Sequence, residues 1–254
     1  MFLRARGERS GRPAVLFVHG LGESGLCFEA FGLSPELSEL QLLVPDLPGY
    51  GRSAWPPSPL SLAETAERLA GWILRRGEGR VVVAGHSMGG VVAQLLARAH
   101  PDLLAGLIDI DGNLTLDDCS FSGRAAGETL ADFLDRGFDE LRNDVYATGV
   151  HNAAHRGYSA SLRLADPLTF HRHSLELVEL SRAETLSGEL ARVDVPVLYI
   201  AGVPGGASAR SRELLDREGV PWRAIGPSGH WPFIDRPADV AREITAFAGA
   251  LTPR

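Results

Sequence analysis

Short apolar runs alternate with amphipathic segments along most of this chain. A short apolar run bounded by turn residues predicts a buried strand, and apolar positions that recur with the helical period predict a helix. We expect strands at Ala14–His19, Gln41–Pro45, Arg80–Gly85, Leu104–Asp111, Pro196–Ala201 and Trp222–Ile225, with a weaker one at Phe2–Arg6. We expect helices at Leu62–Arg75, Met88–His100, Arg210–Glu218 and Ala238–Leu251. Strands that alternate with helices predict the α/β class, with a mostly parallel central sheet flanked by helices.

The alternation stops between Asn113 and Arg192. This stretch contains helical candidates at Ala125–Arg136 and Leu175–Arg182 but no clear strand. A segment of this length does not stay structureless inside a compact domain, so it needs structure of its own. We therefore predict a core formed by residues 1–112 and 193–254, with residues 113–192 inserted as a mainly helical cap.

The composition narrows the classes of partner and chemistry. Of the 254 residues, 44% are hydrophobic and 22% are charged, which is ordinary for a globular protein. The formal net charge is −7 and basic residues do not cluster, so we expect no nucleic-acid or anionic-membrane partner. All 25 basic residues are arginine, which excludes chemistry that needs a lysine, such as Schiff-base formation.

The cysteines and the N-terminal residues bear on the cellular compartment. Cys27 and Cys119 lie far apart in the sequence and indicate neither a disulfide framework nor a zinc site. Residues 1–11 are charged and lack the apolar segment of a signal peptide, and no apolar stretch reaches the length of a membrane span. We therefore expect a cytoplasmic protein.

The strongest chemical motif is G-x-S-x-G at residues 85–89, which follows the apolar run Val82–Ala84 and precedes a predicted helix. A serine on such a sharp turn has strained backbone angles, so its neighbours two positions away must be small. The turn exposes the hydroxyl at the top of the sheet, and the helix N-terminus favours developing negative charge. Ser87 is therefore the candidate nucleophile, and we expect His86 beside it to be buried and structural.

Two further motifs are expected to lie beside Ser87. His230 follows the last predicted strand, and a histidine there returns over the sheet to act as the general base. The loop at residues 18–22 follows the first long strand and reads Val-His-Gly-Leu-Gly. We expect the backbone N–H of Leu21 in this loop to pair with that of Met88 as an oxyanion hole.

In these motifs the chain resembles the α/β-hydrolase superfamily of serine hydrolases. Residues 46–53 read Asp-Leu-Pro-Gly-Tyr-Gly-Arg-Ser and are similar to that superfamily's D-x-x-G-x-G-x-S loop. The resemblance covers Ala14–Asp111 and Val193–Leu251, and it implies a catalytic triad in the chain order nucleophile, acid, base. The predicted cap resembles no family that we would name.

The triad acid departs from the commonest pattern of the superfamily. Members usually carry it in a G-x-x-D turn after the strand before the histidine, but here that turn reads Gly-Val-Pro-Gly at residues 202–205. Some members, such as certain dehalogenases and lipases, place the acid one strand earlier, where this chain has Asp109 and Asp111. Asp111 stands nearer the carboxyl edge of the sheet, where catalytic groups collect, and is the candidate acid. A role for Asp111 as a turn or cap residue is the alternative.

A competing motif occurs in the same region. Residues 20–25 also spell G-x-G-x-x-G, and Asp46 ends the next predicted strand, as in a dinucleotide-binding turn. That interpretation leaves the serine motif and His230 unexplained, whereas a hydrolase accounts for both. We therefore expect no nicotinamide cofactor.

The sequence predicts a serine hydrolase that cleaves an ester, thioester, lactone or related carbonyl substrate through an acyl-enzyme, without a metal or organic cofactor. Three alternatives remain open: an acyltransferase, a carbon–carbon bond hydrolase with the same triad, and a ligand-binding protein with little turnover. The partner is expected to be a small molecule with an apolar portion, selected by the cap. Aromatic cap residues are expected to line the pocket, although they could instead form the cap's own core. These residues are Phe121, Phe133, Phe138 and Tyr146.

Overall fold

The computed structural model describes residues 1–8 and 11–251, which form one seven-stranded sheet and the helices around it. The strands are β1 (Leu3–Arg6), β2 (Val15–Val18), β3 (Leu42–Pro45), β4 (Val81–His86), β5 (Leu104–Ile110), β6 (Val197–Gly205) and β7 (Trp222–Gly229). The helices are α1 (Leu62–Arg76), α2 (Met88–Ala99), α3 (Ser120–Ala126), α4 (Leu130–Asp132), α5 (Phe138–Gly149), α6 (Ala153–Leu162), α7 (Pro167–Arg182), α8 (Leu186–Leu190), α9 (Ala209–Glu218), α10 (Pro232–Asp235) and α11 (Pro237–Ala250).

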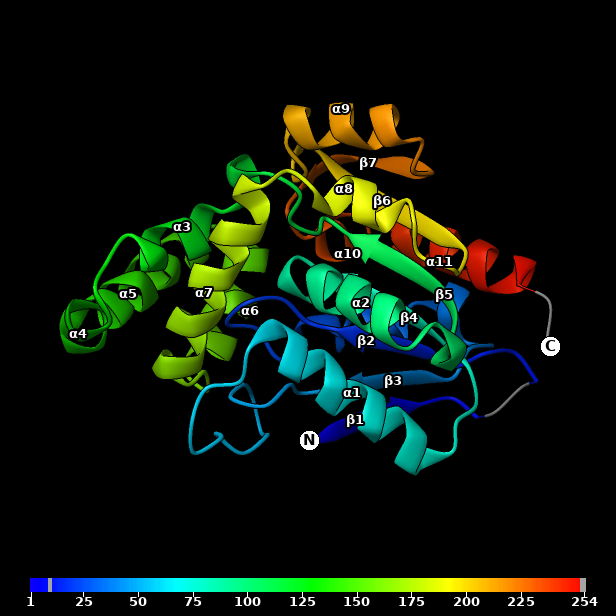
Figure 1. Ribbon diagram of the computed structural model, residues 1–254, viewed down its shortest axis with the longest axis horizontal. Helices are drawn as coiled ribbons and strands as arrows, with labels where there is room; N and C mark the ends of the chain where they lie inside the picture. Colours follow the sequence, from blue (N-terminus) through cyan, green and yellow to red (C-terminus); the bar gives the residue numbers. More distant parts are fainter. Residues whose placement is uncertain (9–10, 252–254) are drawn as a thin grey trace.

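The strands follow the order β1-β3-β2-β4-β5-β6-β7 across the sheet. Strand β1 pairs antiparallel with β3, and all the other pairs are parallel. The carboxyl ends of the parallel strands point toward helices α3 to α7, which lie together at one end of the molecule (Figure 1). Side chains at the ends of β4, β5 and β7 therefore meet at one edge of the sheet, below these helices.

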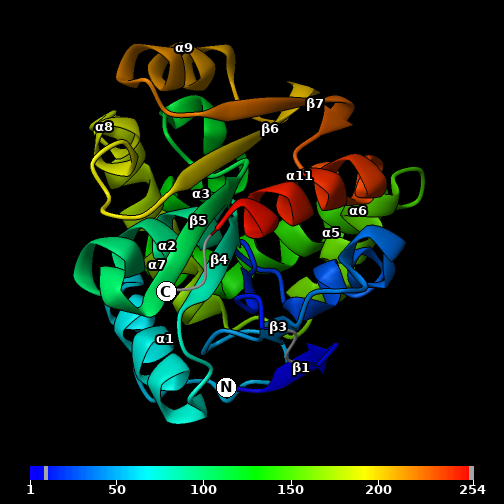
Figure 2. The ribbon, with the colours of Figure 1, turned by 90° about the vertical axis from the view of Figure 1, so that its right-hand side faces the viewer.

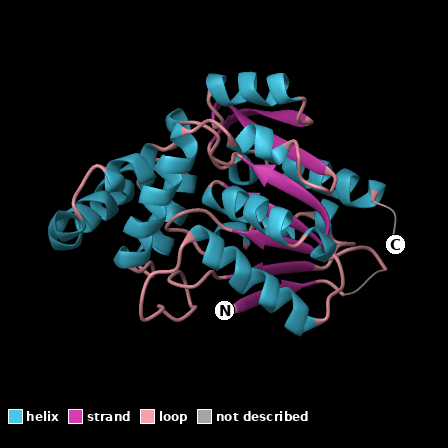
Figure 3. Cartoon of the chain, viewed as in Figure 1, coloured by secondary structure: helices cyan, strands magenta, loops and turns pink. Residues whose placement is uncertain are grey.

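Helices cover both faces of the sheet. Helices α1 and α2 lie on one face and α11 lies on the other (Figure 2). Helices α3 to α7 form a group that contains no strand among the described residues (Figure 3). In the chain this group follows β5 and precedes β6, so the core sheet is completed only after the helical segment.

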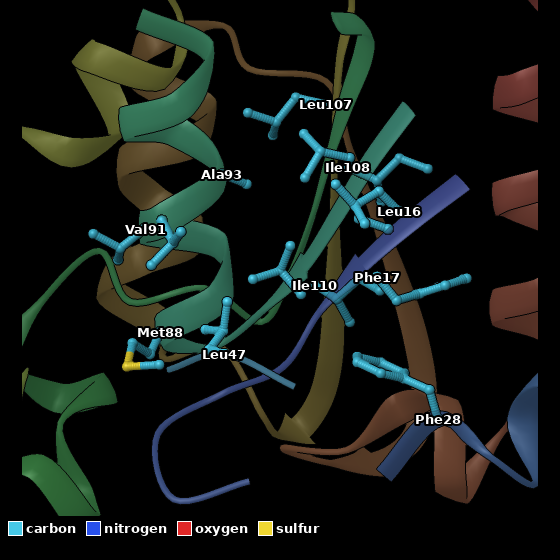
Figure 4. Packing of buried hydrophobic residues seen from close by; sticks show 14 of the residues in the cluster. Leu16, Phe17, Phe28, Leu47, Met88, Val91, Ala93, Leu107, Ile108 and Ile110 are labelled. Atoms are coloured by element: carbon cyan, nitrogen blue, oxygen red, sulfur yellow. The ribbon is translucent and has the colours of Figure 1, made fainter. Parts of the chain in front are cut away.

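The core lies between α2 and the central strands. Ala93 of α2 points toward the strands that carry Ile108 and Ile110 (Figure 4), and all three side chains are fully buried. Every residue of β4 is also buried, because helices cover the sheet on both sides. Each large aliphatic side chain buried in this way stabilises the fold by about 1.5–3 kcal/mol. The packing therefore holds the β4–α2 junction, where Ser87 lies, in one position.

The structure confirms the predicted mostly parallel sheet flanked by helices. Strands β6 and β7 continue past the predicted ends, as far as Gly205 and Gly229, which pair with each other in register. Glycine and proline in these extensions give a weak strand signal, so pattern alone does not find them.

One element of the helical segment between β5 and β6 differs from the prediction. A single helix was expected over Ala125–Arg136, but α3 ends before Gly127 and α4 begins after Thr129. Thr129 accepts a hydrogen bond on its side-chain oxygen from the N–H of Asp132, which is the geometry of a helix N-cap. The N-cap residue Thr129 therefore starts a new helix at a point where the apolar periodicity alone predicts one continuous helix.

Candidate active site

Ser87 occupies the turn between β4 and α2 with φ 53° and ψ −122°, a strained conformation for a residue with a side chain. Gly85 and Gly89, which flank this residue at two positions' distance, have no room for a side chain. A Cβ atom on Gly85 would collide with the carbonyl of Gly89, and a Cβ atom on Gly89 would collide with the carbonyl of Val18. The G-x-S-x-G spacing therefore follows from the crowding of this turn, which leaves Ser87 partly accessible in a cavity.

The predicted oxyanion donors lie on either side of Ser87. Met88 is the first residue of α2, so its N–H has no carbonyl partner within the helix. The loop with Leu21 approaches from β2, and a Cβ atom on Gly20 would lie 3.1 Å from the Cβ of Ser87. Leu21 also lines the cavity that contains Ser87. The arrangement can present two backbone N–H groups to a carbonyl oxygen bound beside the serine.

His230 lies just after β7 and lines the same cavity as Ser87. Its Nδ1 atom is 3.8 Å from Oδ2 of Asp111. That distance exceeds a hydrogen bond, and such contacts commonly shorten when substrate binds. The structure thus brings together the three predicted residues Ser87, Asp111 and His230 at the carboxyl edge of the sheet.

Asp111 stands immediately after β5 with a positive φ of 47°. Its Oδ1 atom accepts hydrogen bonds from the N–H groups of Gly202 at 2.8 Å and Ala207 at 3.0 Å. Its Oδ2 atom is buried and has no hydrogen-bond partner in the described part of the chain. A buried carboxylate oxygen without a partner is costly, so this atom is free for the imidazole of His230.

Burial disfavours charge on both members of this pair. Burial raises the pKa of the Asp111 carboxyl above its ordinary value, and the two N–H donors oppose that shift. Burial, followed by the positive charge of His86, lowers the pKa of His230 to about 3. The imidazole of His230 is therefore neutral at pH 7, as a general base requires.

A buried carboxylate that the sequence analysis did not single out joins the loops around this site. Glu23 Oε2 accepts hydrogen bonds from the N–H of Gly20 at 2.6 Å and from Nδ1 of His86 at 2.9 Å. Its Oε1 accepts from Nε1 of Trp231 at 2.5 Å. Nε2 of His86 in turn donates to the carbonyl of His230 at 2.8 Å. Glu23 and His86 thus connect the oxyanion loop, the serine turn and the histidine loop.

The contacts of His86 fix its charge. Both ring nitrogens face acceptors, Glu23 on one side and the carbonyl of His230 on the other, so the ring needs two protons. Burial opposes charge on both partners, but their mutual attraction prevails: the pKa of Glu23 falls to about 2 and that of His86 rises. A carboxylate in a glycine-rich loop and a histidine beside the serine were the available sequence signals, but their pairing needs the fold.

The cavity at Ser87 is narrow, with a volume of about 20 Å³, and is enclosed partly by the helical segment. Among the four aromatic residues predicted to line it, Phe121 does so. Phe133 and Phe138 instead pack against Phe170, with ring centroids 5.8 Å and 5.4 Å apart, inside the helical group. Tyr146 is 61% exposed on α5. The structure therefore corrects the expectation for these three, because α5 packs mainly against α6, and Phe138 contacts Phe170 of α7 rather than the serine.

The dinucleotide motif has a structural explanation. Asp46 is fully buried and accepts hydrogen bonds from Arg4 and from the N–H groups of Gly25 and Arg52. A Cβ atom on Gly25 would lie 3.1 Å from Asp46 Oδ1, and the motif leads into a 3₁₀ turn rather than a helix. The carboxylate is thus occupied by its own chain, and the loop lacks the helix N-terminus that binds a pyrophosphate.

Two negative findings hold for residues 1–8 and 11–251. No helix in these residues has both the length and the apolar character to span a membrane. No group of three or more His, Cys, Asp or Glu side chains is arranged there to hold a metal ion.

Comparison with known proteins bears on the family of this chain. A family model described as the alpha/beta hydrolase family matches residues 15–243. A pimeloyl-[acyl-carrier protein] methyl ester esterase from Edwardsiella ictaluri is 28% identical, with 94% of each chain covered. Lipase LipV from Mycobacterium tuberculosis is 41% identical over 108 residues, which is only 42% of this chain and 40% of the lipase.

Solved structures give the same result for the fold. The structure of a thermophilic esterase from Thermogutta terrifontis superposes with a TM-score of 0.79 at 24% identity, covering 98% of this chain and 93% of that one. Because the family model spans most of the sequence, this chain belongs to the α/β hydrolase family of enzymes.

Proposed function

We propose that this α/β hydrolase is a serine esterase that uses Ser87 as nucleophile, His230 as general base and Asp111 as the triad acid. One arrangement carries the proposal: Ser87 sits strained in the turn before α2, and His230 shares its cavity and points Nδ1 at the unpaired Oδ2 of Asp111. One of the relatives that match over nearly their whole length is named a methyl ester esterase, which favours an ester substrate.

In the first half-reaction, Ser87 Oγ attacks the carbonyl carbon while His230 takes its proton. Asp111 holds the imidazole in the tautomer with Nδ1 protonated and stabilises the imidazolium that forms. The N–H groups of Leu21 and Met88 bind the oxyanion. The protonated His230 then donates its proton to the departing alcohol.

In the second half-reaction, a water molecule enters beside His230, loses a proton to it and attacks the acyl-enzyme. Collapse of the second tetrahedral intermediate releases the acid and returns the proton to Ser87 Oγ. Each half-reaction uses the same two N–H donors to stabilise the oxyanion, so no further group is needed for that task.

The test is hydrolysis of p-nitrophenyl esters of graded acyl length by the wild type and by Ser87→Ala. We expect turnover by the wild type and a loss of several orders of magnitude in the variant, because the covalent route is removed. A variant that keeps activity within about tenfold of the wild type would contradict the assignment.

A further inference from the structure

Two residues that line the cavity beside Ser87 each carry a buried polar atom that no other described group satisfies. These atoms are Oη of Tyr158 and Oδ1 of Asn113. Both residues line this cavity, and they are only 3% and 2% exposed. Buried polar atoms are nearly always hydrogen-bonded in native proteins, so two orphans at one reactive serine indicate groups that await a ligand.

Tyr158 reaches the cavity from α6. Its ring packs against Phe121 and Trp231, with centroids 4.9 Å and 5.7 Å away, which fixes the direction of the hydroxyl. Oη lies 2.9 Å from the position of a Cβ atom on Gly22, so it stands against the oxyanion loop. Burial, together with the charge of Glu23, raises the pKa of this phenol, so the hydroxyl keeps its proton and can donate it.

Asn113 faces the cavity from the loop after β5, which lies on the other side of β4 from the oxyanion loop. Its Nδ2 donates to the carbonyl of Asp118 at 2.9 Å and lies 3.7 Å from Sγ of Cys119. A carbonyl acceptor requires the amide nitrogen on that side, so the orientation of the side-chain amide is determined. Oδ1 is therefore left as an acceptor, and its partner must be a donor.

We propose that the substrate of Ser87 is a short ester of a hydroxy acid, whose hydroxyl donates to Asn113 Oδ1 and accepts a hydrogen bond from Tyr158 Oη. This inference rests on the proposed esterase function and narrows it. A hydroxyl is the smallest substituent that meets the acceptor, and the narrow cavity, with a volume of about 20 Å³, limits the length of the acyl chain. A plain alkyl ester leaves both polar atoms unpaired and loses affinity in the transition state.

The experiment compares esters that differ only in a methyl group or a hydroxyl at one position. The matched pairs are methyl lactate with methyl isobutyrate, and methyl 3-hydroxybutyrate with methyl isovalerate, followed by pH-stat titration. After division by the uncatalysed rates, we expect kcat/KM of the wild type to favour the hydroxy ester at least tenfold in one of the pairs.

Two variants test the assigned residues. Tyr158→Phe removes only the orphan hydroxyl, and Asn113→Leu removes the acceptor at similar volume. Each should lower the hydroxy-to-alkyl ratio of the preferred pair by about tenfold or more. Tyr146→Phe makes the same chemical change on an exposed tyrosine of α5 and should leave the ratio unchanged.

Thermal unfolding separates binding from a structural role. Because Oη has no partner in the protein, Tyr158→Phe should leave Tm unchanged or raise it while the ratio falls. The inference is overturned if the wild type shows no preference in either pair, or if its preference survives both variants. Absence of turnover for all four esters and for p-nitrophenyl esters would instead count against the esterase function itself.

Discussion

Gly206 lies so close to Asp111 that a Cβ atom there would collide with Oδ2, the carboxylate oxygen that faces His230. Gly206 belongs to the loop after β6, where most members of the superfamily were expected to carry the triad acid. Here Gly206 leaves room for Oδ2, and the N–H groups of Gly202 in β6 and of Ala207 after Gly206 hold the carboxylate of Asp111. The carboxylate after β5 and the glycine after β6 thus depend on each other.

Asp111→Asn should keep the fold and lower kcat by roughly 10⁴-fold, by analogy with the serine protease triad, because the amide favours the wrong tautomer of His230. Asp109→Asn is the matched control two residues earlier. Asp109 is fully buried and bonds Gln94 rather than His230, so its substitution should affect mainly stability. Steady-state kinetics of both variants check this. A large loss of kcat in Asp109→Asn with little change in Asp111→Asn would assign the role of triad acid to Asp109 instead.

Gly206→Ala should lower kcat by roughly 10²-fold, because the added methyl group displaces Oδ2 of Asp111 by a fraction of its contact distance and misplaces the base. Gly249→Ala is the control: a Cβ atom at Gly249, on α11, meets no neighbour within 4 Å. Its Tm should be unchanged or slightly higher, since alanine favours a helix. Equal kcat values for Gly206→Ala and Gly249→Ala would show that the loop after β6 accommodates the methyl group without displacing the carboxylate of Asp111.

Glu23→Gln should lower kcat by roughly 10²-fold with a smaller change in KM, because the positions of Gly20, His86 and Trp231 depend on this carboxylate. The chain supplies a matched pair at the surface, where Glu67 contacts His100 at 3.0 Å but is 59% exposed. Glu67→Gln should change neither kcat nor Tm measurably, since exposed ion pairs contribute little. Similar losses of kcat in Glu23→Gln and Glu67→Gln would show that the buried pair of Glu23 and His86 matters no more to catalysis than an exposed pair.

The pH dependence of stability gives a second measurement on Glu23. Its pKa falls from 4.5 to about 2 on folding, so its contribution is complete above pH 4.5 and is lost as the pH falls toward 2. The pKa of His86 rises on folding, so its contribution is complete below pH 6.5 and is lost as the pH rises through the raised value. The difference in Tm between wild type and Glu23→Gln should therefore be largest between these limits. A difference that is constant from pH 3 to pH 9 would contradict a charged pair.

The acid limb of kcat/KM should lie well below the ordinary histidine range. His230 must be neutral to act as a base, and its pKa is lowered from 6.5 to about 3, so activity is retained as the pH falls below 6.5. Groups that face the ring are His86, Glu23 and His155, besides Asp111. Initial rates between pH 4 and pH 8 check this expectation. An acid limb with its midpoint near 6.5 would mean that the surroundings do not depress the base.

The sequence placed Ser87 and His230 near each other in the fold because the signals around them are local. The crowded turn at Ser87 requires glycine at positions 85 and 89, so the turn can be recognised in the sequence. Asp111 could be inferred because the commoner position holds glycine. In contrast, the contact of Glu23 with His86 joins residues 63 positions apart in the chain, and no periodic pattern reports such a pair.

The helical segment was the least predictable part. Phe138, Leu141 and Val145 follow the helical period on α5, so the helix itself had a signal. The sequence carried no signal for the element that packs against the apolar face of α5. An amphipathic pattern shows which side of a helix is buried but not its partner. For that reason the aromatic residues of α5 were expected at the serine and lie elsewhere.

The most direct test of the central claim is labelling with a fluorophosphonate, a probe that reacts covalently with an activated serine. Intact-mass and peptide mass spectrometry of the treated wild type should find one adduct, on the peptide that contains Ser87, and Ser87→Ala should carry none. An unlabelled wild type, or an adduct that persists at another residue in Ser87→Ala, would contradict a serine hydrolase centred on Ser87.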